Sequence, residues 1–138
     1  MNLDRVSGLA LVQALVERAG NRTDLELAVC PPFVYLEAMA AALAGSQIGL
    51  GAQNMSSEAK GAFTGEVSAA MLKDVGCRYV ILGHSERRQL FHETDSDVNK
   101  KLLAALAAGL IPIVCVGEVL AQRQAGQTLN VIRAQFEG

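Results

Sequence analysis

The chain has 138 residues, 51% of them hydrophobic and 19% charged, a balance typical of a globular domain. Its formal net charge of −2 favours no nucleic-acid surface, and no apolar run approaches the roughly 18 residues that would span a bilayer. The first residues lack the basic start and apolar stretch of a secretory signal. Three cysteines without C-x-x-C spacing are typical of a reduced compartment. We therefore expect a cytoplasmic protein that binds neither nucleic acid nor membrane.

Short apolar strands alternate with helices along the chain. A first helix is predicted over residues 6–16, where apolar residues recur at helical spacing. Four β-rich runs follow, and their starts are separated by 23, 31 and 32 residues, the size of one strand-and-helix unit. The predicted strands are residues 25–30, 48–53, 79–83 and 111–116, and the helices after them are residues 36–43, 67–74, 94–109 and 128–137.

The helix over residues 94–109 has the clearest boundaries. Thr94 and Asp97 have the spacing of a capping box, and Gly109 marks the end of the helix just before a proline-containing strand. Its predicted apolar face consists of Val98, Leu102, Ala105, Leu106 and Gly109.

Near-continuous apolar strands that alternate with helices predict an α/β fold with a parallel sheet covered by helices. A doubly wound sheet normally carries a G-x-G-x-x-G turn after its first strand, and no strand here is followed by one. Four units are half of an eight-unit (β/α)8 barrel of roughly 250 residues. We expect residues 1–138 to form a single domain, a portion of a TIM barrel.

The loop after the third strand concentrates polar chemistry, because His84 is followed there by Glu86, Arg87 and Arg88. In this fold class ligands bind at the carboxyl ends of the strands, so His84 is a candidate catalytic residue. In a structural alternative, His84 only caps the strand and both arginines are solvated. A metal site built from His84, Glu86, His92 and Glu93 is disfavoured, since the H-E-x-x-H spacing is missing.

The loop after the second strand spans residues 54–66 and is long for a connection inside a compact α/β unit. Such loops often carry function or contact a partner. Phe63 favours a partner contact over a mobile surface excursion, because an aromatic side chain in a solvated loop gains by being buried.

Five segments together resemble the triosephosphate isomerase family, in its order and spacing. They are GAQN at residues 51–54, GAFTGE at 61–66, YVILGHSERR at 79–88, F-x-E-T-D at 91–95 and CVGE at 115–118. The resemblance covers essentially the whole chain. It implies strands 2 to 5 of a TIM barrel, a phosphorylated triose as substrate, and no cofactor or metal.

The resemblance also implies roles for individual residues. His84 would be the neutral electrophile that polarises the substrate carbonyl, and the start of the short helical turn after it would disfavour the imidazolium. Glu86 would contact the active-site lysine of the family. Ser85, Gln53 and Asn54 would supply supporting hydrogen bonds, and Cys115 would pack beside the catalytic acid.

The same resemblance implies a homodimer. Thr64, at the tip of the long loop, would reach the active site of a second subunit, and Glu66 would pair with Arg87 across the interface. Phe63 and Gly65 belong to the same predicted interface.

Two other catalytic groups of the family match no position in these 138 residues. The resemblance places the substrate-binding lysine just before Met1 and the glutamate base beyond Gly138. We therefore expect a barrel truncated at both ends, inactive by itself. The alternatives are a non-catalytic half-barrel that self-associates through the loop at residues 55–66, and a metal-assisted phospho-sugar enzyme.

Overall fold

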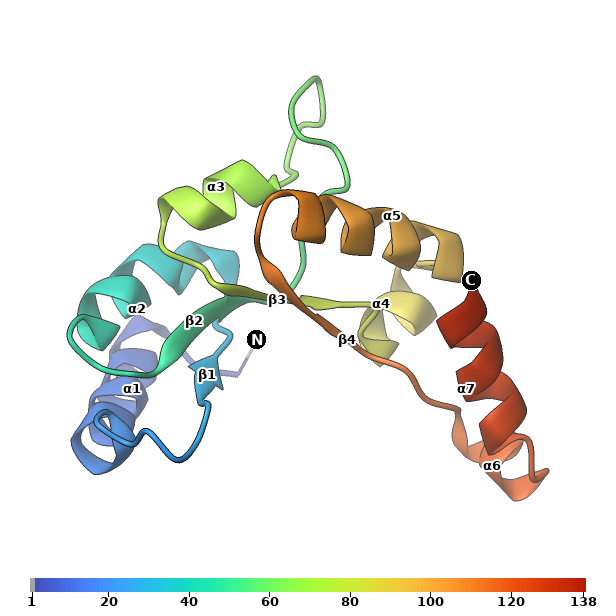
Figure 1. Ribbon diagram of the computed structural model, residues 1–138, viewed down its shortest axis with the longest axis horizontal. Helices are drawn as coiled ribbons and strands as arrows, with labels where there is room; N and C mark the ends of the chain where they lie inside the picture. Colours follow the sequence, from blue (N-terminus) through green and yellow to red (C-terminus); the bar gives the residue numbers. More distant parts are fainter. Residues whose placement is uncertain (1) are drawn as a thin grey trace.

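The computed structural model describes residues 2–138. Met1, just before which the resemblance places the substrate-binding lysine, lies outside the described residues. Its centre is a parallel sheet with strand order β1-β2-β3-β4 (Figure 1). The strands are Ala28–Val29 (β1), Gly49–Ala52 (β2), Tyr79–Leu82 (β3) and Ile111–Val114 (β4). Each pairs in parallel with the next one along the chain. Because β1 and β4 are not neighbours in this order, the sheet is open, as expected for part of a TIM barrel.

Helices follow the strands in the predicted alternation. They are α1 (Arg5–Ala19), α2 (Leu36–Leu43), α3 (Ala69–Asp74), α4 (Ser85–Leu90), α5 (Asp95–Ala107), α6 (Leu120–Gln124) and α7 (Thr128–Glu137), with a 3-10 turn η1 (Phe33–Tyr35) before α2. Helix α6 was not predicted from the sequence. With five residues it is too short for a helical periodicity to be recognised.

Helix α5 confirms the predicted capping box. Thr94 Oγ1 accepts a hydrogen bond from the Asp97 amide at 3.2 Å, and Asp97 Oδ2 accepts one from the Thr94 amide at 3.0 Å. The chain leaves the helix through Gly109, which has a φ of +75°, a conformation that glycine adopts at little cost. The predicted apolar face was wrong at Leu106, which is 55% exposed, and at Gly109, which is exposed and lies beyond the end of α5. Leu106 lies on one flank of the Val98–Ala105 face, and the buried residue lies on the opposite flank, at Lys101.

The hydrophobic core lies on only one face of the sheet. Val80 and Leu82 are fully buried and belong to the core that the helices complete. Successive side chains of a strand point to opposite faces, so Ile81 points to the other face, together with its β4 partner Ile113. Figure 1 shows an arch with helices α2, α3 and α5 along its outer side and the strands along its inner side. We call this inner side the open face; Ile111 and Ile113 there are each 41% exposed.

Candidate active site

Gly83 connects β3 to α4 and so determines where His84 lies. Its φ is +66°, and a Cβ atom at this position would stand 2.9 Å from Val98 Cγ2. Both the backbone conformation and the close approach of α5 therefore require glycine. The chain turns here directly from a buried strand into a helix, which leaves His84 as the N-cap of α4 with 45% of its side chain exposed.

The hydrogen bond at the start of α4 selects one tautomer of His84. Its Nδ1 accepts a hydrogen bond from the backbone amide of Glu86 at 3.3 Å. A ring nitrogen that accepts carries no proton, so the neutral imidazole holds its proton on Nε2. The Glu86 carboxylate lies 3.6 Å from the same Nδ1 and is 75% exposed. His84 thus presents an Nε2–H donor, while Ser85 is exposed in the first turn of α4.

Arg88 is not a solvated side chain, so the structural alternative was wrong on this residue. Its side chain is 16% exposed and pairs with Asp95, at 2.5 Å between Nη1 and Oδ1. Its Nε donates to the carbonyl oxygen of Gly83 at 2.8 Å, and Nη2 donates to that of Cys115 at 3.4 Å. One guanidinium therefore joins the carboxyl ends of β3 and β4 to the start of α5. Burial raises the pKa of the Cys115 thiol, and the Arg88 charge opposes this shift only in part.

Arg87 is also held by a carboxylate. Its Nε donates to Glu93 Oε1 at 2.9 Å, and its guanidinium lies 4.9 Å from the centre of the Phe91 ring. The Arg87 side chain remains 29% exposed. Both arginines of α4 are thus bound by carboxylates outside the helix, and these contacts hold the helix that His84 caps.

Glu93 belongs to a charge cluster that consists of Arg87, Glu93, Lys101 and Asn54. Lys101 forms a short ion pair with Glu93 and donates to Asn54 Oδ1 at 3.0 Å. Burial alone would raise the pKa of the Glu93 carboxyl, but the hydrogen bonds and charges of Lys101 and Arg87 outweigh it and lower that pKa. Glu93 is therefore ionised at neutral pH, and the cluster carries two cations and one anion.

Lys101 was not among the predicted site residues, and Glu93 was considered only as part of the F-x-E-T-D segment and as a disfavoured metal ligand. Lys101 lies three residues after Val98, on the flank of the α5 face opposite Leu106, and is 9% exposed. A lysine beside an apolar helical face was the available signal. It carried little weight because lysine is usually solvated.

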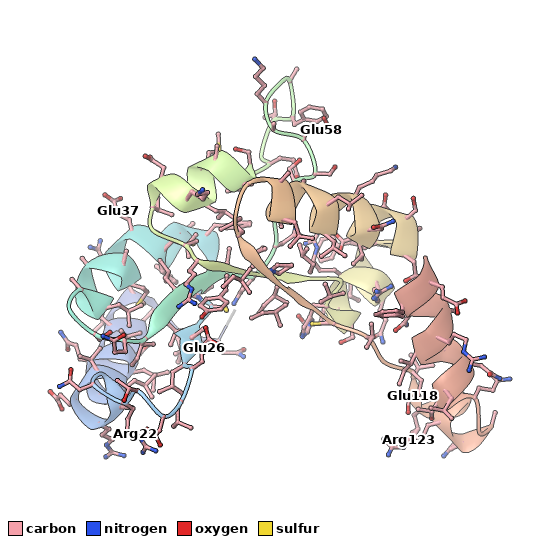
Figure 2. All side chains as sticks on the ribbon, viewed as in Figure 1. Arg22, Glu26, Glu37, Glu58, Glu118 and Arg123 are labelled. Carbon is pink, nitrogen blue, oxygen red and sulfur yellow. The ribbon has the colours of Figure 1, made fainter. Side chains whose placement is uncertain are left out.

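The long loop has a buried base and an exposed tip. Its base is held by Met55, which is 1% exposed, and by the Ser56 amide, which donates to the carbonyl oxygen of Val67 at 2.8 Å. Phe63, near the tip, is 48% exposed. The loop projects beyond α3 and α5 in Figure 1, and Figure 2 shows Glu58 on it. Thr64, Gly65 and Glu66 are likewise exposed.

Gln53, the remaining predicted residue, and Glu118 of the CVGE segment lie after other strands of the sheet. Gln53 Nε2 donates to the carbonyl oxygen of Cys30 at 2.9 Å, which links the ends of β1 and β2. After β4, Glu118 Oε1 accepts a hydrogen bond from Thr128 Oγ1 at 3.0 Å and lies 3.9 Å from Arg123 Nε (Figure 2). Glu118 therefore serves the start of α7 rather than the His84 site.

Within residues 2–138, the His, Cys, Asp and Glu side chains gather into no group of three that could hold a metal ion. The same residues contain no helix long and apolar enough to cross a membrane.

Comparison with known proteins identifies the family. A family model described as triosephosphate isomerase matches residues 1–138. The chain belongs to the triosephosphate isomerase family. The triosephosphate isomerase of Rhodopirellula baltica is 55% identical over 138 residues, which cover 100% of this chain and 54% of the relative. That of Chloroflexus aurantiacus is 61% identical over 125 residues, which cover 91% of this chain and 50% of the relative.

Membership of the triosephosphate isomerase family accounts for the open sheet. The chain spans about half the length of the curated relatives it matches. Half of an eight-stranded barrel is four parallel strands, which is what the sheet contains.

Proposed function

We propose that this chain is the part of a triosephosphate isomerase that carries the electrophile His84. The complete barrel interconverts dihydroxyacetone phosphate and D-glyceraldehyde 3-phosphate through an enediolate, in glycolysis and gluconeogenesis in the cytoplasm. The observation that supports this proposal is the hydrogen bond from the Glu86 amide to His84 Nδ1. It leaves Nε2–H, on a half-exposed ring at the carboxyl end of β3, as the donor for a substrate oxygen.

In the proposed mechanism a base removes a proton from the carbon next to the substrate carbonyl. His84 Nε2–H donates to the carbonyl oxygen and stabilises the negative charge that develops there. The imidazole then passes its proton to that oxygen and recovers one from the hydroxyl on the neighbouring carbon. The base then delivers its proton to the former carbonyl carbon, and the neighbouring carbon becomes the new carbonyl carbon. Glu86 has the role of contacting the lysine that binds the substrate.

We further propose that the 138 residues have no turnover by themselves, since the lysine and the base match none of their positions. Removing members of a cooperating site costs several orders of magnitude in rate. The test is therefore a chimaera in which this chain replaces the matching segment of the Rhodopirellula baltica relative, assayed beside the chain alone.

In this chimaera we expect His84→Gln to lower kcat by about 10²- to 10⁴-fold with little change in KM, because the lost donor acts on the transition state. His92→Asn is the matched control, since His92 is the other histidine and is 8 residues further on. An unchanged kcat in His84→Gln would remove His84 from the mechanism. An inactive chimaera that is folded would contradict the proposed function.

We also propose a homodimer in which Phe63, Thr64, Gly65 and Glu66 contact a second copy and Glu66 pairs with Arg87 across the interface. Support comes from the exposed Phe63 ring and from the part of the Arg87 side chain that Glu93 leaves exposed. In the chimaera, Phe63→Ser should raise the dimer dissociation constant, measured by sedimentation velocity. An unchanged constant would contradict this interface.

A further inference from the structure

Glu93 binds both cations of the charge cluster through one oxygen. Oε1 accepts from Arg87 Nε at 2.9 Å and from Lys101 Nζ. Among the described residues, Oε2 is the buried side-chain oxygen without a hydrogen-bond partner. The Glu93 side chain is only 7% exposed. Burying ions is costly unless they are well paired, so stability alone is a poor explanation for the cluster.

One branch of the cluster leads to His84. Glu93 holds Arg87 twice, through the side-chain ion pair and through its own amide, which donates to the Arg87 carbonyl oxygen at 3.2 Å. The Arg87 amide in turn donates to the His84 carbonyl oxygen at 2.8 Å. Helix α4 has six residues, less than two turns, and would be marginal without such contacts. The orientation of His84 therefore depends on a helix that Glu93 anchors.

The other branch leads to the base of the long loop. Lys101 extends from α5 and reaches both Glu93 and Asn54. Asn54 is 8% exposed and is the second residue after β2, where the loop begins. The loop base and the His84 helix are 30 residues apart in sequence and are joined through one carboxylate.

The backbone bends sharply at the residue before Glu93. His92 has a φ of +57°, a left-handed conformation that is unfavourable for a residue with a Cβ. This bend directs the chain after α4 back along the helix, where the Glu93 amide meets the Arg87 carbonyl group. Such an outlier persists only where the surrounding contacts hold it.

Resting on the proposed function, we propose that Glu93 is a positioning residue for the isomerase reaction. Through Arg87 it fixes the orientation of His84, and through Lys101 and Asn54 it fixes the base of the long loop. A purely structural Glu93 would affect the stability of the protein and leave kcat unchanged.

The experiment compares Glu93→Gln with Tyr79→Phe in the chimaera. Glu93→Gln keeps the shape of the side chain and leaves the buried Lys101 and the partly exposed Arg87 without their anion. Tyr79→Phe removes a hydrogen bond to Glu26 at the opposite end of β3 and is the matched structural control. We expect Glu93→Gln to lower kcat by about 10- to 100-fold with KM nearly unchanged, since small misplacements of catalytic groups have effects of this size. Tyr79→Phe should lower Tm without lowering kcat.

Amide hydrogen exchange gives a readout that does not require activity. In Glu93→Gln the Arg87 and Arg88 amides, which donate to the His84 carbonyl oxygen, should exchange at least several-fold faster. In Tyr79→Phe their exchange should match that of the parent chimaera. If Glu93→Gln does not fold, Glu93→Asp, which keeps the charge on a shorter side chain, is measured in its place.

A folded variant with unchanged kcat and unchanged exchange of the Arg87 and Arg88 amides overturns the proposal. An inactive parent chimaera overturns the proposed function instead, and the exchange rates still decide whether Glu93 holds α4. Faster exchange with unchanged kcat also overturns the proposal, because the anchoring would then have no effect on catalysis.

Discussion

The site depends on single residues in unfavourable states that their neighbours stabilise. Glu93 is a buried anion between two cations, and among residues 2–138 His92 is the one residue other than glycine with a positive φ. Cys77 shows how strongly burial shifts a pKa in this chain. Burial, with a smaller contribution from nearby Cys30, raises the pKa of its thiol to about 11. Residues of this kind identify where the fold constrains chemistry most tightly.

His92 provides a test of backbone strain. His92→Gly should change the free energy of unfolding by less than about 1 kcal/mol, because relief of the left-handed strain offsets the greater freedom of the unfolded chain. His92→Val should lose about 1–2 kcal/mol or more, since a branched side chain tolerates this conformation poorly. Urea unfolding of the purified chain measures both. A valine variant as stable as the parent would show that no strain is stored at this position.

At the scale of elements, α5 joins the sheet to the site. Its Val98–Ala105 face packs on the sheet, and the lysine on the flank of this face supports the charge cluster. Asp95 at its start binds Arg88, so the helix contacts both arginines of the His84 loop, one directly and the other through Glu93. Since α5 contacts α4 through these two arginines, we expect its capping box to affect the geometry of α4.

Thr94→Ala tests this cap. The substitution removes the side-chain oxygen that accepts from the Asp97 amide and should lower the free energy of unfolding by about 1 kcal/mol. Ser96→Ala, an exposed change in the same first turn, is the control and should stay within about 0.5 kcal/mol. Equal effects of the two substitutions in urea unfolding would contradict a stabilising role for the capping box.

At the scale of the whole molecule, helices cover only one face of the sheet. Helices bury Val80 and Leu82 completely, whereas the open face exposes Ile111 and Ile113 along the unpaired edge of β4. Exposed apolar strand edges favour association. This is the observation that favours the alternative of a self-associating half-barrel, although it points to the sheet rather than to the long loop.

The isolated chain should therefore associate at micromolar concentrations, and Ile113→Lys should weaken this association. Val34→Lys replaces an apolar residue that is 82% exposed on η1, away from β4, and should have little effect. Sedimentation velocity over a range of concentrations distinguishes these outcomes. A parent chain that stays monomeric at every concentration would contradict self-association through the open face.

The sequence predicted the elements well where local signals are strong and poorly where contacts define them. The helix at Leu36–Leu43 and that at Thr128–Glu137 were predicted with the observed boundaries. The first strand was expected over residues 25–30 but pairs only at Ala28–Val29. Strand length depends on hydrogen bonds to a neighbour, and β1 has a neighbour on one side only within the described residues.

By itself, the sequence determined the α/β alternation, the caps and the family, because periodicity, capping and motif order all act over short stretches of chain. It also placed His84 at a strand end. Only the tertiary structure showed that Lys101 reaches Asn54, which is 47 residues away, and that both meet at Glu93. Local patterns mark a lysine or a glutamate as solvated. Whether such a charge is buried and paired depends on which distant segments the sheet brings together.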